Sequence, residues 1–125
     1  MKKDVNISCL DKKNLKIIRE SVSKFIKKCA NKYDIQKKSL LDIAPQDYEG
    51  AKEYFKKTDV YTLDINPKEN PDFIADICTT NDDLIKDKSF DYILCTEVLE
   101  HTLNPFDAVN EMYRILKNDG LLFIT

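Results

Sequence analysis

Hydrophobic positions recur at two different spacings along this chain of 125 residues. Between residues 11 and 30, apolar side chains return every three or four positions with lysines between them, which predicts an amphipathic helix with Asp11 as its N-cap. Residues 47–57 and 104–120 have the same spacing and predict two further helices, the second ending at Gly120. The face that this last helix is expected to share comprises Phe106, Val109, Met112, Tyr113 and Leu116.

Short apolar runs bounded by turn residues lie between the helical segments. They occupy residues 39–44, 60–65, 72–77, 89–96 and 121–125. Strands that alternate with helices predict a parallel sheet with helices on both faces. Continuous apolar character agrees, because parallel strands are buried on both sides. The pattern therefore predicts an α/β fold, a Rossmann-like three-layer sandwich around a mostly parallel sheet of about five strands.

The length allows one domain, which we place at residues 1–125, with an N-terminal helix region at 1–37 and a core at 38–125. Hydrophobic residues make up 42% and charged residues 34%, as in globular proteins. No apolar run reaches the roughly 20 residues of a membrane span, and the start lacks the apolar stretch of a secretion signal. The cysteines show no CxxC spacing, and two of them, Cys29 and Cys95, lie inside apolar periodic segments. This pattern favours a reducing compartment, so we expect a cytoplasmic protein.

Charge is distributed unevenly along the chain. Residues 1–40 hold twelve Lys/Arg and four Asp/Glu, a net of +8, whereas residues 41–125 have a net charge of −10. A basic helix could contact nucleic acid or anionic lipid, or it could be a solvated outer face. The acidic remainder argues against a broad nucleic-acid footprint, so nucleic acid is not an expected partner.

Acidic residues stand at several of the predicted strand ends, where parallel sheets bind ligands. Asp64 follows Asp42 by about twenty residues, and its two oxygens could accept both hydroxyls of a ribose; alternatively it begins the turn at Asn66. Asp76 could accept a hydrogen bond from an adenine amine, or could simply enter a turn. Asp42 could bind an ammonium group, or could cap the following helix.

Several stretches, read together, resemble a known enzyme family. They are LLDIAPQ, VYTLDINP, DFIADI and SFDYILCTEVLEHTLNPFDAVNEMYRILKNDGLLFIT. Over residues 38–125 they are similar to the class I S-adenosylmethionine-dependent methyltransferases, especially type 11. The resemblance implies the strand order 3-2-1-4-5, S-adenosyl-L-methionine as cofactor with S-adenosyl-L-homocysteine as product, and methyl transfer to a small-molecule or glycan-precursor acceptor. The cofactor-binding residues that it implies are Asp42, Ala44, Gln46, Asp64, Ile65, Asp76, Ile77, Thr96 and Glu97.

The chain departs from this family in its first loop. Ala44, Gln46 and Tyr48 stand where the family has glycines, and Pro45 removes one N–H. S-adenosylmethionine carries no phosphate, so the loop does not need the row of backbone donors that a pyrophosphate requires. The loop could therefore still bind cofactor, or the chain could be a non-catalytic pseudo-methyltransferase that serves as a scaffold or interaction module.

A second departure is the short C-terminal part. Members of the family continue beyond the fifth strand with antiparallel strands, whereas this sequence stops at LLFIT. We expect the final antiparallel strands to be missing and the chain to be a fragment or a truncated product. The uncovered final strand could then pair with a second copy, giving a homo-oligomer.

The stretch EVLEH supplies Glu97, Glu100 and His101, the only histidine of the chain. On the first turn of a helix these side chains would face one side, where they could serve as a general base for the acceptor. Carboxylates and imidazole could also bind Mg²⁺, Mn²⁺ or Zn²⁺, as in the ubiquinone-pathway O-methyltransferases whose spelling this stretch resembles. Many type 11 relatives carry a similar stretch without metal, so the metal-dependent reaction is the alternative and no metal is the expectation.

Overall fold

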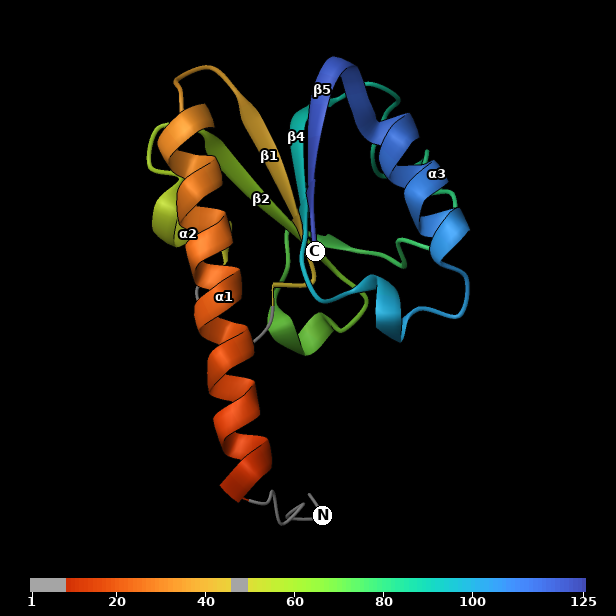
Figure 1. Cartoon of the computed structure of the whole chain (residues 1–125). Coiled ribbons are helices and arrows are strands. Elements are labelled where there is room, and N and C mark those ends of the chain that lie inside the picture. Colours follow the sequence, from red (N-terminus) through yellow and green to blue (C-terminus); the bar gives the residue numbers. More distant parts are fainter. Residues whose placement is uncertain (1–8, 46–49) are drawn as a thin grey trace.

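The five strands form one parallel sheet in the order β3-β2-β1-β4-β5 (Figure 1). The computed structural model describes residues 9–45 and 50–125. The strands are β1 Ser39–Ile43, β2 Asp59–Asp64, β3 Phe73–Ile74, β4 Phe90–Cys95 and β5 Leu116–Ile124. Every pair of neighbouring strands is parallel. The predicted fold class and strand order are confirmed.

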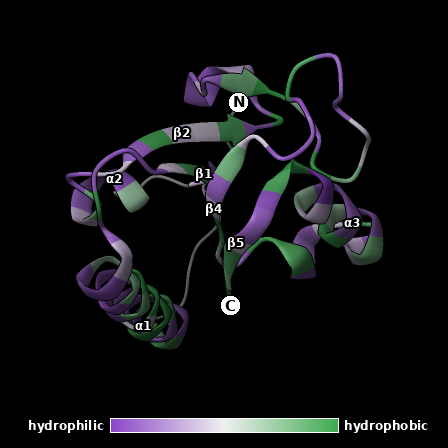
Figure 2. Ribbon diagram, turned by 90° about the horizontal axis from the view of Figure 1, so that it is seen from above, coloured by the Kyte–Doolittle hydropathy of each residue, from purple (hydrophilic) through white to green (hydrophobic). Residues whose placement is uncertain are grey.

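Helices cover both faces of the sheet. Helices α1 (Cys9–Tyr33) and α2 (Ala51–Tyr54) lie on one face and α3 (Pro105–Ile115) on the other. Figure 2 looks nearly along α1 and shows this separation, with the sheet between the two layers. Short 3-10 turns, η1 (Pro67–Glu69) and η2 (Leu99–His101), follow β2 and β4. In the part of the chain that the structure describes, no helix is both long and apolar enough to cross a membrane.

The core consists of two apolar clusters, one on each side of the sheet, because successive side chains of a strand point to opposite faces. Leu41, Ile43 and Ile93 pack with Met112 and Ile115 of α3. The second cluster joins the alternate strand positions to α1 and α2, and comprises Val22, Ile26, Cys29, Ala30, Leu40, Ala51, Phe55, Tyr92, Leu94 and Phe123. The apolar runs of the central strands are thus buried on both sides, as predicted, and Cys29 and Cys95 are buried free thiols.

Helix α1 is longer than predicted and only half of it packs on the sheet. It begins at Cys9, so Asp11 lies in the first turn and is not the N-cap. Residues 9–21 are exposed, and burial begins at Val22. In Figure 1 the exposed half extends past the carboxyl edge of the sheet.

Two other elements are shorter than the sequence predicts. Helix α2, predicted over residues 47–57, covers only Ala51–Tyr54, and residues 46–49 lie outside the described part of the chain. It ends because Phe55 takes an extended backbone and buries its ring in the core. Strand β3, predicted over residues 72–77, is limited to two residues that pair with Leu63 and Asp64.

The predicted helix end at Gly120 is wrong, because α3 ends at Ile115 and β5 begins at the next residue. The backbone N–H of Lys88 donates to the carbonyl of Arg114 at 2.9 Å, and that of Ser89 to the carbonyl of Ile115 at 2.8 Å. These hydrogen bonds direct the chain into the sheet. The register then shifts, so that residues 117–120 form a bulge before Leu121 pairs with Tyr92. The left-handed residue in this bulge is Asp119, with φ 65°.

The face predicted for this helix is also wrong, apart from Met112 and from Leu116, which packs against the core as the first residue of β5. The helix buries Ala108, Met112 and Ile115, whereas Phe106 and Tyr113 are 79% and 82% exposed. Polar contacts account for this difference. Glu111 and Arg114 form hydrogen bonds with the segment between β3 and β4 and with each other, and these bonds fix the rotation of the helix about its axis.

Candidate functional site

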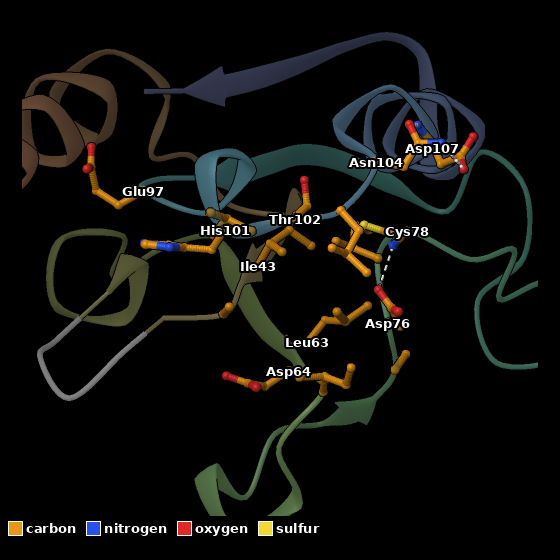
Figure 3. Close-up of a pocket in the computed structure, with 16 residues that line it drawn as sticks. Ile43, Leu63, Asp64, Asp76, Cys78, Glu97, His101, Thr102, Asn104 and Asp107 are labelled. Atoms are coloured by element: carbon orange, nitrogen blue, oxygen red, sulfur yellow. Dashed lines mark hydrogen bonds between the residues drawn. The ribbon is translucent and has the colours of Figure 1, made fainter.

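A cavity of about 540 Å³ lies at the carboxyl ends of β1 to β4 (Figure 3). Its volume falls within the range of roughly 300–1,000 Å³ that is usual for small-molecule sites. The residues that line it are Ile43, Ala44, Leu63, Asp64, Ile65, Ala75, Asp76, Ile77, Cys78, Glu97, Val98, His101, Thr102, Leu103, Asn104 and Asp107. This is the edge at which the sequence predicts a ligand site.

Six of the nine predicted cofactor residues line this cavity: Ala44, Asp64, Ile65, Asp76, Ile77 and Glu97. Asp42 and Thr96 are not lining residues in the described part of the chain, and Gln46 lies outside it. The cavity also includes residues that the sequence does not predict as part of a site, namely Ile43, Leu63, Ala75, Cys78, Val98, Thr102, Leu103, Asn104 and Asp107. Of these only the pair Asn104-Pro105 carries a recognisable signal, that of a helix N-cap.

Asp64 is the last residue of β2 and is largely buried. Its Oδ1 accepts a hydrogen bond from the backbone N–H of Asn66 at 2.8 Å, so the predicted turn role is present. The side chain nevertheless lines the cavity and lies along its lower edge in Figure 3. A carboxylate held in this way presents fixed acceptors for hydroxyl groups.

Asp76 lies two residues beyond β3, so it does not end that strand as predicted. Its Oδ1 accepts from the N–H of Cys78 at 2.8 Å, and its carbonyl accepts from the Asn81 side chain at 2.9 Å. Burial and the charge of Asp76 raise the pKa of the Cys78 thiol. The Asp76 carboxylate is therefore a fixed acceptor at the end of the cavity opposite Glu97 and His101 (Figure 3).

Asp42 is 2% exposed and is directed at α2. Its Oδ2 accepts from the N–H of Ala51 at 2.7 Å, which is the helix-capping alternative that the sequence offers. Burial raises the pKa of Asp42 to about 7. A Cβ at Gly50 would overlap Asp42 Oδ2, so this glycine, which sequence reasoning left without a role, makes room for the cap.

The first loop turns out of β1 through Ala44, whose φ is 47°. Its N–H donates to the carbonyl of Leu63 at 2.7 Å, which holds the residue at the strand end. The left-handed region costs an L-residue roughly 1–2 kcal/mol, whereas glycine enters it freely. Ala44 thus takes a backbone conformation that glycine enters more easily than alanine does.

The EVLEH stretch does not form the predicted first turn of a helix. Glu97 has a left-handed backbone with φ 54°, and only Leu99–His101 form a 3-10 turn. The N–H of Glu97 donates to Thr125 Oγ1 at 3.3 Å, and that hydroxyl donates to Glu97 Oε1 at 3.1 Å. Glu97 and Glu100 therefore do not share a helix face.

Glu97 and His101 line the cavity, whereas Glu100 does not. His101 Nε2 lies 3.9 Å from Glu100 Oε1, and both side chains are largely exposed. Within residues 9–45 and 50–125, no three His, Cys, Asp or Glu side chains gather as a metal site would require. What the two lining groups can offer is proton transfer at one end of the cavity.

Comparison with known proteins agrees with the fold. The family model described as "Methyltransferase domain" matches residues 25–124. The ubiquinone biosynthesis O-methyltransferase of Glaesserella parasuis serovar 5 (strain SH0165) is 43% identical over 54 residues, which are 43% of this chain and 21% of that protein.

Two solved structures illustrate the shared fold. A candidate S-adenosyl-L-methionine-dependent methyltransferase from Methanococcus maripaludis superposes with a TM-score of 0.63 at 18% identity, covering 99% of this chain and 66% of the other. Coclaurine N-methyltransferase bound to N-methylheliamine and SAH superposes with a TM-score of 0.54 at 21% identity, covering 99% of this chain and 38% of the other. This chain therefore spans less than two thirds of the length of these relatives. With the family match over residues 25–124 and the strand order of the sheet, the chain belongs to the class I S-adenosylmethionine-dependent methyltransferases.

Proposed function

We propose that this chain binds S-adenosyl-L-methionine in the cavity and serves methyl transfer to an O, N or C atom of a small-molecule or glycan-precursor acceptor. The observation that supports the proposal is the pair of fixed carboxylates, Asp64 at the end of β2 and Asp76 after β3, in one cavity of suitable volume. The left-handed backbone at Ala44 adds to it, because glycine, which the family has at this position, enters this conformation freely.

Each end of the cavity has a distinct task in this proposal. Asp64 accepts from the ribose hydroxyls, while Asp76 and the backbone at Ile77 receive the adenine. Ile65 and the other apolar lining residues contact the rings and exclude water. Asp42 acts from outside the cavity, by holding the start of α2.

The reaction needs little from the protein beyond orientation. When bound, S-adenosyl-L-methionine supplies an electrophilic methyl group on a sulfonium centre. The chain holds the acceptor in line with that group, and orientation of this kind can account for much of a rate enhancement. If the acceptor must lose a proton, Glu97 and His101 are the lining groups that can take it.

Titration calorimetry with S-adenosyl-L-homocysteine tests the binding step. We expect Asp64→Ala to weaken binding by about tenfold or more, since hydrogen bonds to a charged group contribute roughly 1.5–3 kcal/mol. Asp76→Ala should weaken it less, because one amine hydrogen bond is lost and not two hydroxyl contacts. Asp82→Ala is the matched control, an exposed carboxylate outside the cavity lining. Equal affinities for all three variants would contradict the assignment.

A non-catalytic scaffold is the second candidate, and the position of Asp42 favours it. This carboxylate is committed to α2 and does not line the cavity, so one acceptor that the family resemblance assigns to the cofactor is directed elsewhere. The same titration separates the two functions. A scaffold would give no binding heat with S-adenosyl-L-methionine or S-adenosyl-L-homocysteine. A separate unfolding experiment should then show a cooperative transition, which means that the protein is folded.

Four free cysteines, two of them buried, fit a reducing compartment, and we infer a cytoplasmic location. Nucleic acid is not a proposed partner, because residues 41–125 have a net charge of −10. A second copy could pair along β5, which stands at the edge of the described sheet.

A further inference from the structure

The charged side chains around the cavity are acidic. Among its lining residues the titratable groups are the carboxylates of Asp64, Asp76, Glu97 and Asp107 and the imidazole of His101. In the part of the chain that the structure describes, no lysine or arginine lines the cavity. A cleft lined by charges of one sign concentrates ligands of the opposite sign and repels those of the same sign. The cavity therefore favours cationic ligands.

Basic side chains elsewhere do not neutralise this charge. Lys38 and Lys117 both bridge Asp91, at 3.4 and 3.2 Å, near the start of β4 and so at the edge of the sheet opposite the cavity. Arg114 bridges Glu111 on α3 at 2.6 Å. Of the salt bridges that join residues within 9–45 and 50–125, none pairs a lining carboxylate with lysine or arginine. The negative charge thus remains available to a ligand.

Glu97 and His101 are the charged groups that the nucleoside of the cofactor leaves free in the proposed function. Both line the cavity at the end opposite Asp76 (Figure 3). The Thr125 hydroxyl donates to Glu97 Oε1 at 3.1 Å and accepts from the Glu97 N–H at 3.3 Å, so β5 holds both the backbone and the carboxylate of this residue. His101 is exposed. An acceptor molecule that reaches this end meets a held carboxylate and an accessible imidazole.

We propose that the methyl acceptor is a basic amine, which binds as its ammonium ion to Glu97 and is methylated on nitrogen. This inference rests on the proposed function and narrows its acceptor from O, N or C atoms to one chemical class. The ammonium donates charge-assisted hydrogen bonds to the carboxylate. A carboxylate or phosphate acceptor would meet like charges and, among the described lining residues, no basic side chain.

The same two residues account for the proton that such an acceptor must lose. An ammonium nitrogen has no lone pair, so one proton first passes to the neutral imidazole of His101 and from there to water. The freed lone pair then forms the bond from nitrogen to the methyl carbon, while the carbon–sulfur bond breaks and its electron pair stays on sulfur. The methylated nitrogen is again a cation, and the Glu97 carboxylate faces a positive charge before and after the transfer.

The test compares three probes that share one phenol ring and differ in charge: tyramine, a cation, tyrosol, which is neutral, and 4-hydroxyphenylacetate, an anion. Calorimetry at pH 7 measures their binding to the protein saturated with S-adenosyl-L-homocysteine. Tyramine should bind about tenfold more tightly than tyrosol, and 4-hydroxyphenylacetate more weakly than either. Added salt should weaken tyramine binding and leave tyrosol binding unchanged, since it screens charge. Equal affinities, or a preference for the anion, would overturn the inference.

Glu97→Gln removes the charge and keeps an oxygen that can accept from Thr125. Its affinity for tyramine should fall to that for tyrosol, while tyrosol and S-adenosyl-L-homocysteine bind as they do to wild type, which shows that the site is intact. Glu69→Gln makes the same change at an exposed residue of η1 outside the cavity lining, and should keep the preference for tyramine.

Two results with the variants would also overturn the inference: a preference for tyramine that survives in Glu97→Gln, or one that is lost equally in Glu69→Gln. Neither affects the proposed function, because wild type still binds S-adenosyl-L-homocysteine in both cases. Absence of heat when S-adenosyl-L-homocysteine is added to wild type would overturn the proposed function, and this inference with it.

Discussion

Single residues at the strand ends carry more than one role in this protein. Asp64 and Asp76 each use one oxygen to hold their own turn and still line the cavity. Ala44 and Glu97 take left-handed backbones just beyond Ile43 and Cys95, the last paired residues of β1 and β4. Left-handed non-glycine residues persist only where the surrounding structure holds them, and they concentrate at functional sites. Here the contacts from Leu63 and Thr125 hold them.

The buried carboxyl of Asp42 should make the stability of the folded protein depend on pH. Its pKa is about 7 in the folded protein and near 3.8 when unfolded, so folding favours the protonated carboxyl. The stability that this group contributes is complete below about pH 4 and is lost as pH rises toward 7. Asp42→Asn keeps an oxygen acceptor for Ala51 without the charge. The variant should therefore gain stability relative to wild type with rising pH, on the order of 3 kcal/mol by pH 8.

Urea unfolding of both proteins between pH 4.5 and 8 measures this difference directly. The other titrating groups are common to both proteins and cancel in the comparison. A stability difference that stays constant over this range would show that Asp42 does not titrate as its burial requires.

Some residues of the site could be predicted from the sequence because their role shows in the local pattern. Others could not, because their role depends on contacts in the folded protein. Asp64 was predictable because a polar residue at the end of an apolar run is visible in the sequence. Leu103 was not, because a leucine between two turns gives no sign of being exposed to a cavity. Gly50 was visible only as a late glycine, since its role depends on the approach of the Asp42 side chain.

At the scale of elements, the polar contacts of α3 decide how the helix sits. Glu111 accepts from the N–H of Asn81 at 2.8 Å and from the guanidinium of Arg114 at 2.6 and 2.8 Å. Arg114 donates onward to the carbonyl of Ile85 and to Asp87, both at 2.8 Å. Although burial raises it, hydrogen bonds from Arg114 and Asn81 hold the pKa of Glu111 below its usual value. The network fastens the segment between β3 and β4 onto the helix.

Replacing one charged residue of this network should destabilise the protein, and replacing both should destabilise it by less than the two single losses together. Glu111→Leu leaves the Arg114 guanidinium half-buried without its main partner, and we expect a loss of about 3 kcal/mol in the free energy of unfolding. The double variant Glu111→Leu/Arg114→Leu removes both charges and should lose clearly less than the sum of the two single variants. Urea unfolding at pH 7 measures all four proteins. Additive losses would mean that the contacts do not act together.

The strands of the sheet could be predicted from hydrophobic spacing, whereas the buried face of α3 could not. In β1 and β4 every apolar position is buried, so the pattern and the structure agree whichever face is considered. In α3, residues 106, 109 and 113 match helical spacing as well as residues 108, 112 and 115 do. The choice between the two stripes depends on contacts with residues 81–87, which hydrophobic spacing does not encode.

At the scale of the whole molecule, the edge of the sheet and the outer side of α3 offer different surfaces for self-association. Strand β5 stands at one edge of the described sheet and includes the partly exposed Ile124. Tyr113 is exposed on α3. Edge strands tend to pair with another strand, and charged side chains on them oppose that pairing.

We expect this chain to form a concentration-dependent dimer through β5. Sedimentation equilibrium should show weaker association for Ile124→Lys than for wild type, because a charge on the edge disfavours strand pairing. Tyr113→Lys, which places the same charge on α3, should leave the association unchanged. If Tyr113→Lys dissociates the dimer and Ile124→Lys does not, the contact lies on α3. A monomer at all concentrations would contradict the prediction altogether.

The exposed half of helix α1 has a consequence for how the molecule unfolds locally. Its residues 9–21 are exposed in the part of the chain that the structure describes, while the turns from Val22 onward contribute to the core. A helical segment of this length is marginal in water when nothing covers it. The two halves of this continuous helix therefore belong to different cooperative units: the outer turns can melt and re-form beside the carboxyl edge of the sheet while the inner turns open only with the body.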